Sequence, residues 1–147
     1  MNQEARAVLL ITRRAILRLF LTFAAIIWGM CVAGIFAPAP VAFNLLEYIG
    51  GMDASPLLAN PIYDYWLRMA SGAFALIGAG YAALALWPQR FAGALPLAGA
   101  FMILEGLVLL THGLRLGLPP SPFWADTAAC LVGGLGIFLC MGSVRRQ

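Results

Sequence analysis

Long apolar runs, almost free of acidic and basic side chains, dominate the chain. Three runs lack such side chains entirely: Leu19–Leu46, Met69–Gln89 and Thr127–Val144. A fourth follows Arg90 and is interrupted only by Glu105 and His112 before its end. An α-helix needs roughly 20 apolar residues to cross a hydrocarbon core. Because the runs do not alternate apolar with polar residues, and are about twice as long as a barrel strand, they predict four membrane-spanning helices.

Helix-breaking residues place the ends of these spans. Pro38 and Pro40 end the first helix, because proline lacks an amide hydrogen and clashes with the preceding turn. Gly50-Gly51 and Asn60-Pro61 mark turns. The predicted helices cover residues 15–37, 62–87, 94–116 and 122–141, and a surface loop covers 38–61. The sequence therefore predicts an all-α, single membrane domain over residues 1–147: a four-helix bundle with a short amphipathic surface helix between the first two spans.

Composition and charge agree with a membrane protein and indicate its orientation. The chain is 63% apolar and only 10% charged, whereas soluble domains carry about 25% charged residues. All of the positive charge comes from arginine. If four helices alternate, seven arginines fall on one side: Arg6, Arg13, Arg14, Arg18, Arg90, Arg145 and Arg146. Because positive loops stay in the cytoplasm, we expect both termini there, in a bacterial inner membrane, and no nucleic-acid partner.

A second interpretation of the N-terminal region is an export signal. The stretch Thr12–Leu17, with its paired arginines, looks like a twin-arginine motif. The apolar run after it is longer than the apolar region of a signal peptide, and prolines follow the small residues near Ala37. We therefore expect an uncleaved first helix.

Small residues recur along the predicted spans. In lipid, helices associate where small side chains let their backbones approach closely. The predicted packing residues are Ala25, Gly29 and Ala33 in the first span, Ser71, Ala75, Ala79 and Ala83 in the second, and Ala129 and Gly133 in the fourth.

The polar residues inside the spans are the candidates for function. Glu105 lies near the middle of the third span, where a charged residue usually faces the protein interior and has a partner. His112 follows by seven residues, so it shares the same helix face. We expect Arg68 to reach Glu105. The six expected members of one charge-balanced polar cluster are Asp64, Arg68, Glu105, His112, Arg115 and Asp126.

Two interpretations of this cluster stay open. As a binding site, it would use Glu105 as a proton carrier, His112 as an acid, base or quinone partner, and Arg68 as an anion clamp. As a structural network, it would only fix the order of the helices. The sequence contains no HExxH, GxSxG or phosphate-loop motif, so we assign no catalytic residue and no metal site. The only ligand class indicated is a quinone or lipid.

The segment from Tyr65 to Met141 resembles the small four-helix bacterial membrane proteins called DoxX-like. The resemblance rests on YWLRMASGAFALIGAGYAAL, on HGLRLGLPPSPF at the end of the third span, and on the Gly/Ala-rich fourth span. It implies a neighbourhood of quinone redox systems or accessory subunits.

Three functions are compatible with these features. The first is a non-catalytic accessory or scaffold subunit, with other membrane subunits or further copies of itself as partners besides the lipid bilayer. The second is a quinone- or lipid-binding protein, or a proton-coupled small transporter, that uses Glu105, Arg68 and His112. The third is a membrane-embedded isomerase or oxidoreductase. If the face of Glu105 points into a cavity, the second and the third function are favoured. If this face is filled by side chains or faces lipid, the first is favoured.

Overall fold

The computed structural model describes the backbone of residues 3–51, 53, 55–118 and 120–145, and the side chains of residues 8–51, 53, 55–118 and 123–144. Within these ranges all regular structure is helical: α1 (Gln3–Gly29), α2 (Val32–Phe36), α3 (Ala39–Gly50), α4 (Ser55–Leu58), α5 (Pro61–Leu86), α6 (Leu95–Leu116) and α7 (Pro120–Arg145). Four helical segments of the described chain are long and apolar enough to span a membrane: Val8–Phe36, Pro61–Leu86, Leu95–Leu116 and Phe123–Val144. The prediction of an all-helical protein is therefore confirmed for the described residues, and four of its helical segments are candidates to span a membrane.

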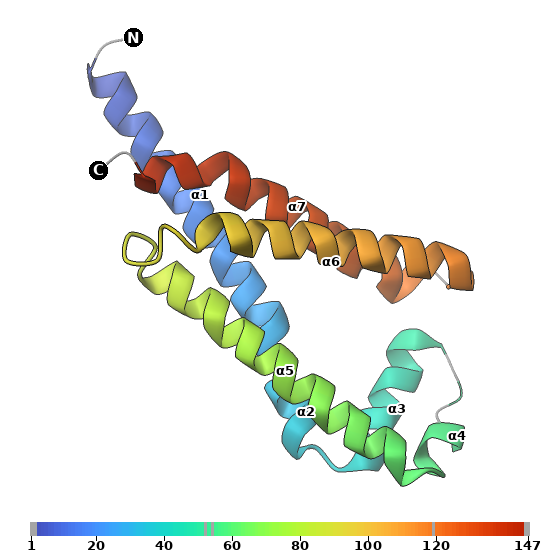
Figure 1. Ribbon diagram of the computed structural model, residues 1–147. Helices are drawn as coiled ribbons and strands as arrows, with labels where there is room; N and C mark the ends of the chain where they lie inside the picture. Colours follow the sequence, from blue (N-terminus) through green and yellow to red (C-terminus); the bar gives the residue numbers. More distant parts are fainter. Residues whose placement is uncertain (1–2, 52, 54, 119, 146–147) are drawn as a thin grey trace.

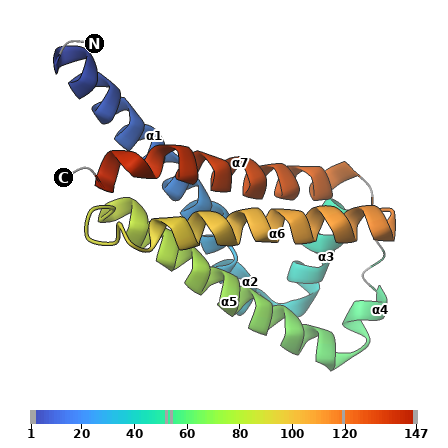
Figure 2. The same ribbon diagram turned by 45° about the horizontal axis from the view of Figure 1, so that its top comes forward.

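The helices form two closely packed pairs that share one end (Figures 1 and 2). α6 and α7 lie side by side along their lengths, and α1 packs against both α5 and α7. The start of α1, the end of α7 and the turn between α5 and α6 lie at one end of the molecule, which we call the turn end. From this turn α5 and α6 diverge, and α3 and α4 lie at the other end.

The helix ends differ from the prediction in two places. α1 begins at Gln3 instead of residue 15, because the segment before Arg14 contains neither glycine nor proline and continues the helix. Residues 3–14 therefore form the first turns of α1. The first span is also interrupted at Met30 and Cys31, where α1 ends and α2 begins.

The predicted turns after the first span are confirmed. α3 follows Pro38 and ends at Gly51, whose left-handed backbone (φ 63°) suits a residue without Cβ. The carboxamide oxygen of Asn60 accepts a hydrogen bond from the Ile62 amide (3.1 Å) and caps α5. Before α4, the side chain and the backbone amide of Ser55 both hydrogen-bond to Asp53 and lower the pKa of its carboxyl.

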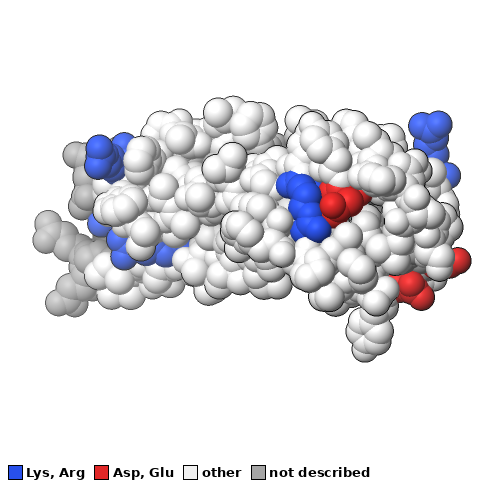
Figure 3. Space-filling model, turned by 90° about the horizontal axis from the view of Figure 1, so that it is seen from below, with Lys and Arg blue, Asp and Glu red and all other residues white. Residues whose placement is uncertain are grey.

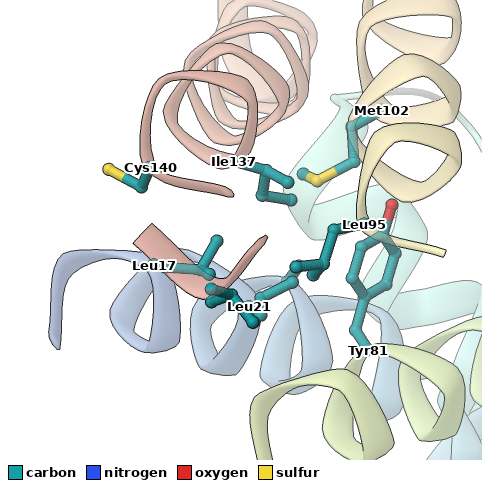
Figure 4. Close-up of a cluster of buried hydrophobic side chains, with 9 residues drawn as sticks. Leu17, Leu21, Tyr81, Leu95, Met102, Ile137 and Cys140 are labelled. Atoms are coloured by element: carbon teal, nitrogen blue, oxygen red, sulfur yellow. The ribbon is translucent and has the colours of Figure 1, made fainter. Parts of the chain in front are cut away.

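The buried core lies toward the turn end, where all four spans meet. Figure 4 shows Leu17 and Leu21 of α1 opposite Leu95 of α6, with Ile137 of α7 and Tyr81 of α5 around them. The hydroxyl of Tyr81 donates a hydrogen bond to the carbonyl of Ala98 (2.9 Å), which joins α5 to α6. The Arg14 Nε donates to the carbonyl of Ser143 (3.1 Å) and joins α1 to α7. Both bonds fix the helices at the turn end.

Glycine forms the closest contacts between α6 and α7. Gly99, Gly106 and Gly113 are seven residues apart, and all three are buried. A Cβ atom at Gly134 would lie 2.8 Å from the carbonyl oxygen of Gly99, and the ring of Phe123 covers Gly113. A seven-residue repeat stays on one face of a helix. This repeat therefore keeps α6 against α7 along its length.

A second glycine contact joins α1 to α5. A Cβ atom at Gly78 would lie 2.6 Å from the Cα atom of Gly29. About two turns before Gly78 on α5, the buried side chain of Ser71 lies against Gly34 of α2. A Cβ atom added at Gly34 would lie 3.1 Å from the Ser71 Cβ atom. The backbones of the first two spans thus approach as closely as helices can.

The predicted packing residues agree with these interfaces only in part. Ser71 and Gly133 are buried, and the half-buried predicted residues are Ala25, Gly29, Ala75, Ala83 and Ala129. Ala33 and Ala79 are exposed, so their assignment to an interface is wrong. For Ala33 the reason is geometric: at about 100° per residue, a strict four-residue spacing drifts by about 40° at each step and leaves the contact face. Ala79 lies between the half-buried Ala75 and Ala83, so this drift does not explain its exposure.

The Gly29–Gly78 contact predicts which glycine tolerates a side chain. Gly78→Ala should destabilise the protein by about 1–3 kcal/mol, because the new methyl group meets backbone atoms that cannot move independently. Gly72→Ala is the matched control on the same helix, since a Cβ atom there has no neighbour within 4 Å. Unfolding in mixed detergent micelles measures both. Equal stability of the two variants would show that α1 and α5 do not touch at Gly78.

Candidate functional site

A cleft of about 710 Å³ lies between α5 and α6. One wall consists of α5 residues that lie between Phe74 and Leu84 and face α6. The other wall extends along α6, from its start to Val108. Trp28 of α1 and Phe91 of the α5–α6 turn complete the lining. We call this space the α5–α6 cleft.

The cleft exists because α5 and α6 meet only near the turn end. The hydrogen bond from Tyr81 to Ala98 joins the two helices within the part of the cleft near the turn end, and the helices separate beyond it (Figures 1 and 2). Each helix packs with its small residues against another partner, α5 against α1 and α6 against α7. The side chains that α5 and α6 turn toward the cleft include the bulky Phe74, Ile77 and Phe101. Close approach of the two backbones is therefore blocked.

Glu105 contributes the carboxylate that lines the cleft. Its side chain is half-buried, and the other lining residues are apolar except for the Tyr81 hydroxyl and the Trp28 indole N–H. Within the described part of the chain, the Glu105 carboxylate has neither an ion-pair partner nor a hydrogen-bond donor. The predicted arginine partner of Glu105 is therefore not found among the described residues.

Arg68 bonds to other groups than the expected Glu105. Its Nη1 donates to the carbonyl oxygens of Gly34 (2.7 Å), Ile35 (3.3 Å) and Ala37, at the end of α2. Its Nη2 donates to the Asp64 carboxylate at 2.8 Å. The last carbonyls of a helix lack intrahelical partners and carry partial negative charge. Arg68 thus caps α2; the predicted pair with Asp64 is confirmed, and the predicted pair with Glu105 is wrong.

The remaining members of the predicted polar cluster do not come together. His112, Arg115 and Asp126 are all exposed, and the Arg68–Asp64 bridge is the one ion pair among the residues that the structure describes. The lining of the cleft ends at Val108, before His112. Of the six predicted members, Glu105 alone is part of the cleft lining, and the expected charge-balanced cluster around it is not formed by ion pairs among the described residues.

No metal centre is formed in the described ranges. Nowhere in them do three or more histidine, cysteine, aspartate or glutamate side chains come close enough to hold an ion. Glu105 and His112 therefore belong to no such group among these residues.

Aromatic residues of the cleft were not singled out from the sequence. The rings of Trp28 and Phe74 lie 5.0 Å apart and are tilted by 49°. The signal was present: Trp28 lies in the middle of an apolar run, whereas Trp66, Trp87 and Trp124 fall near span ends, where amphipathic rings usually settle. A tryptophan at mid-span suggests an internal surface.

No family model matches the sequence, and neither a curated protein nor a solved structure shows significant similarity to the chain. The resemblance to DoxX-like proteins stays a prediction. The functional argument rests on the cleft and on the distribution of charge.

The role of Arg68 leads to a stability prediction. Hydrogen bonds to charged groups contribute about 1.5–3 kcal/mol, so Arg68→Gln should speed hydrogen exchange of the α2 and α3 amides at least about tenfold. Arg115→Gln is the matched control, because that side chain is exposed and makes no bond within the described residues. Hydrogen-exchange mass spectrometry in nanodiscs measures both. Unchanged exchange in Arg68→Gln would contradict the capping role.

Proposed function

We propose that this polytopic membrane protein binds a lipophilic small molecule in the α5–α6 cleft, with Glu105 as the polar contact. One observation carries the proposal: a half-buried carboxylate without a partner among the described residues lines an apolar cleft inside a predicted span. Ionisable groups within a membrane span are costly, and they usually mark ligand or ion pathways. The protein would act as a binding or transport protein for such a molecule; a quinone and a lipid are the ligand classes expected from the sequence.

The size and the position of the cleft support this function. Small-molecule sites occupy roughly 300–1,000 Å³ and are mostly apolar with a few polar groups, and the cleft of about 710 Å³ falls in this range. Both of its walls belong to membrane-spanning candidates. A ligand dissolved in the bilayer would therefore enter sideways between α5 and α6, without passing through water.

The orientation in the membrane forms part of the proposal. Arg13, Arg14 and Arg18 lie on α1 toward the turn end, and Arg90 lies in the α5–α6 turn. Figure 3 shows several basic side chains at one end of this face; the acidic side chains lie in the middle and at the other end, where further basic side chains accompany them. By the positive-inside rule the turn end faces the cytoplasm. α3 would then lie at the outer surface of a bacterial inner membrane.

A second candidate function is that of an accessory subunit. It is favoured by the exposed small residues of α5, since Ala73, Ala79 and Gly80 are uncovered, and a Cβ atom at Gly72 or Gly80 has no neighbour within 4 Å. Small residues of this kind allow a further helix to approach. The resemblance to DoxX-like proteins points to the same two neighbourhoods, quinone systems and accessory subunits.

Filling the cleft tests the ligand-binding proposal. Gly80 lines the cleft with open space around it, so Gly80→Leu should fold normally and occupy part of the ligand volume. We expect photocrosslinking of a photoreactive quinone analogue and of a diazirine phospholipid, in nanodiscs, to label α5 and α6 in the wild type. Labelling by the preferred probe should fall several-fold in Gly80→Leu. Gly72→Leu, which lies outside the lining, should label like the wild type.

Labelling spread evenly over all lipid-facing helices, and insensitive to Gly80→Leu, would contradict ligand binding in the cleft. Loss of labelling in both leucine variants alike would also contradict it, because the effect would then not depend on the cleft.

Orientation is tested with single cysteines in a background from which Cys31, Cys130 and Cys140 have been replaced. A membrane-impermeant maleimide should label Asp53→Cys in intact spheroplasts, and Gln89→Cys only after permeabilisation. Both wild-type side chains are exposed, so labelling depends only on the side of the membrane. The reverse pattern would invert the proposed topology.

A further inference from the structure

We infer that the α5–α6 cleft takes a lipophilic organic cation, whose charge pairs with Glu105 and whose apolar groups contact the aromatic walls. This inference rests on the proposed function, because it names the chemical class of the ligand for the same site. It is argued from the charges, the hydrogen-bond donors and the rings of the lining.

The charge of the lining is negative and uncompensated. Glu105 is its acidic residue, and no arginine is part of it. Arg68, the arginine expected as a partner, is engaged with Asp64 and with three carbonyl oxygens. Arg115 follows Glu105 by ten residues on the same helix, about 15 Å along its axis. A carboxyl group in an apolar medium is either neutralised by a proton or paired with a positive group, and here a ligand can supply the positive group.

The walls of the cleft are suited to a cation with apolar substituents. Phe101 precedes Glu105 by four residues, so its ring lies on the same face of α6. Across the cleft are the rings of Trp28 and Phe74, 5.0 Å apart. Aromatic faces attract cations, and the attraction grows when water is excluded. Organic cations with aryl or alkyl groups use both features of the lining.

The hydrogen-bond donors of the lining argue against a quinone. Quinone carbonyls need donors, and in the ionised form that pairs with a cation Glu105 only accepts. The Tyr81 hydroxyl already donates to Ala98, which leaves the indole N–H of Trp28 as the donor without an acceptor in the described part of the chain. An anionic lipid headgroup would be repelled by Glu105. The lining thus favours a cation over both alternatives.

The test compares two ions of equal size and shape and opposite charge. Radiolabelled tetraphenylphosphonium should bind saturably to the wild-type protein in nanodiscs of zwitterionic lipid, whereas tetraphenylborate should not. Glu105→Gln should weaken tetraphenylphosphonium binding by at least about tenfold, the effect of a lost charge-assisted bond. Asp126→Asn should bind like the wild type, because Asp126 is exposed and lies outside the lining.

Other outcomes overturn the inference. Equal binding of the two ions, or tetraphenylphosphonium binding unaffected by Glu105→Gln, would show that the carboxylate does not select charge. If the photoreactive quinone analogue still labels the cleft and Gly80→Leu still blocks it, the proposed function stands and only the ligand class is wrong. If neither probe binds, both are wrong. Should Glu105→Gln fail to fold, the two-ion comparison in the wild type and the loss of tetraphenylphosphonium binding in Gly80→Leu decide the question.

Discussion

Helices in a bilayer gain little by burying leucine against leucine, because lipid tails are equally apolar, so they associate where small residues allow their backbones to touch. Among the described residues, glycine contacts join α6 to α7, α1 and α2 to α5, and α7 to α1 through Gly136 and the ring of Phe20. Gly99, Gly106 and Gly113 hold α6 against α7, and the Gly29–Gly78 contact holds α1 against α5. No glycine contact of this kind joins α5 to α6 within the described chain. The two pairs are therefore linked firmly at the turn end and diverge beyond it.

The divergence of α5 and α6 gives Glu105 its surroundings. The helix face that carries Glu105 borders an apolar cleft and meets no basic side chain there. Arg68 is withdrawn from this role because the first span ends in the short helix α2, whose last carbonyls need donors. Because Arg68 bonds to the carbonyl oxygens at the end of α2, it does not pair with Glu105, and this carboxylate is accessible to a ligand in the cleft. The cationic ligand class follows from this unequal distribution of charge.

The sequence predicted those features that depend on neighbouring residues. The four apolar runs, the turn at Asn60-Pro61, the stop at Gly51 and the Asp64–Arg68 pair are all local, and the structure has them. The bonds of Arg68 to α2 depend on a helix break at residue 30 that no proline marks, so they could not be anticipated.

The sequence also did not reveal that α5 and α6 are the helices that separate. This depends on how the other helix pairs (α1 with α5, α6 with α7, and α1 with α7) pack through their small residues. Small residues four apart drift around an α-helix, whereas the seven-residue glycine spacing on α6, which is visible in the sequence, stays close to one face.

The most direct test of the central claim is pulsed dipolar spectroscopy on two spin-labelled pairs between α5 and α6, Leu86 with Leu97 near the turn and Met69 with Leu114 far from it. All four positions are exposed. The account predicts a clearly longer separation for the second pair. Equal separations would mean that α5 and α6 pack side by side along their whole lengths and that the cleft around Glu105 does not exist.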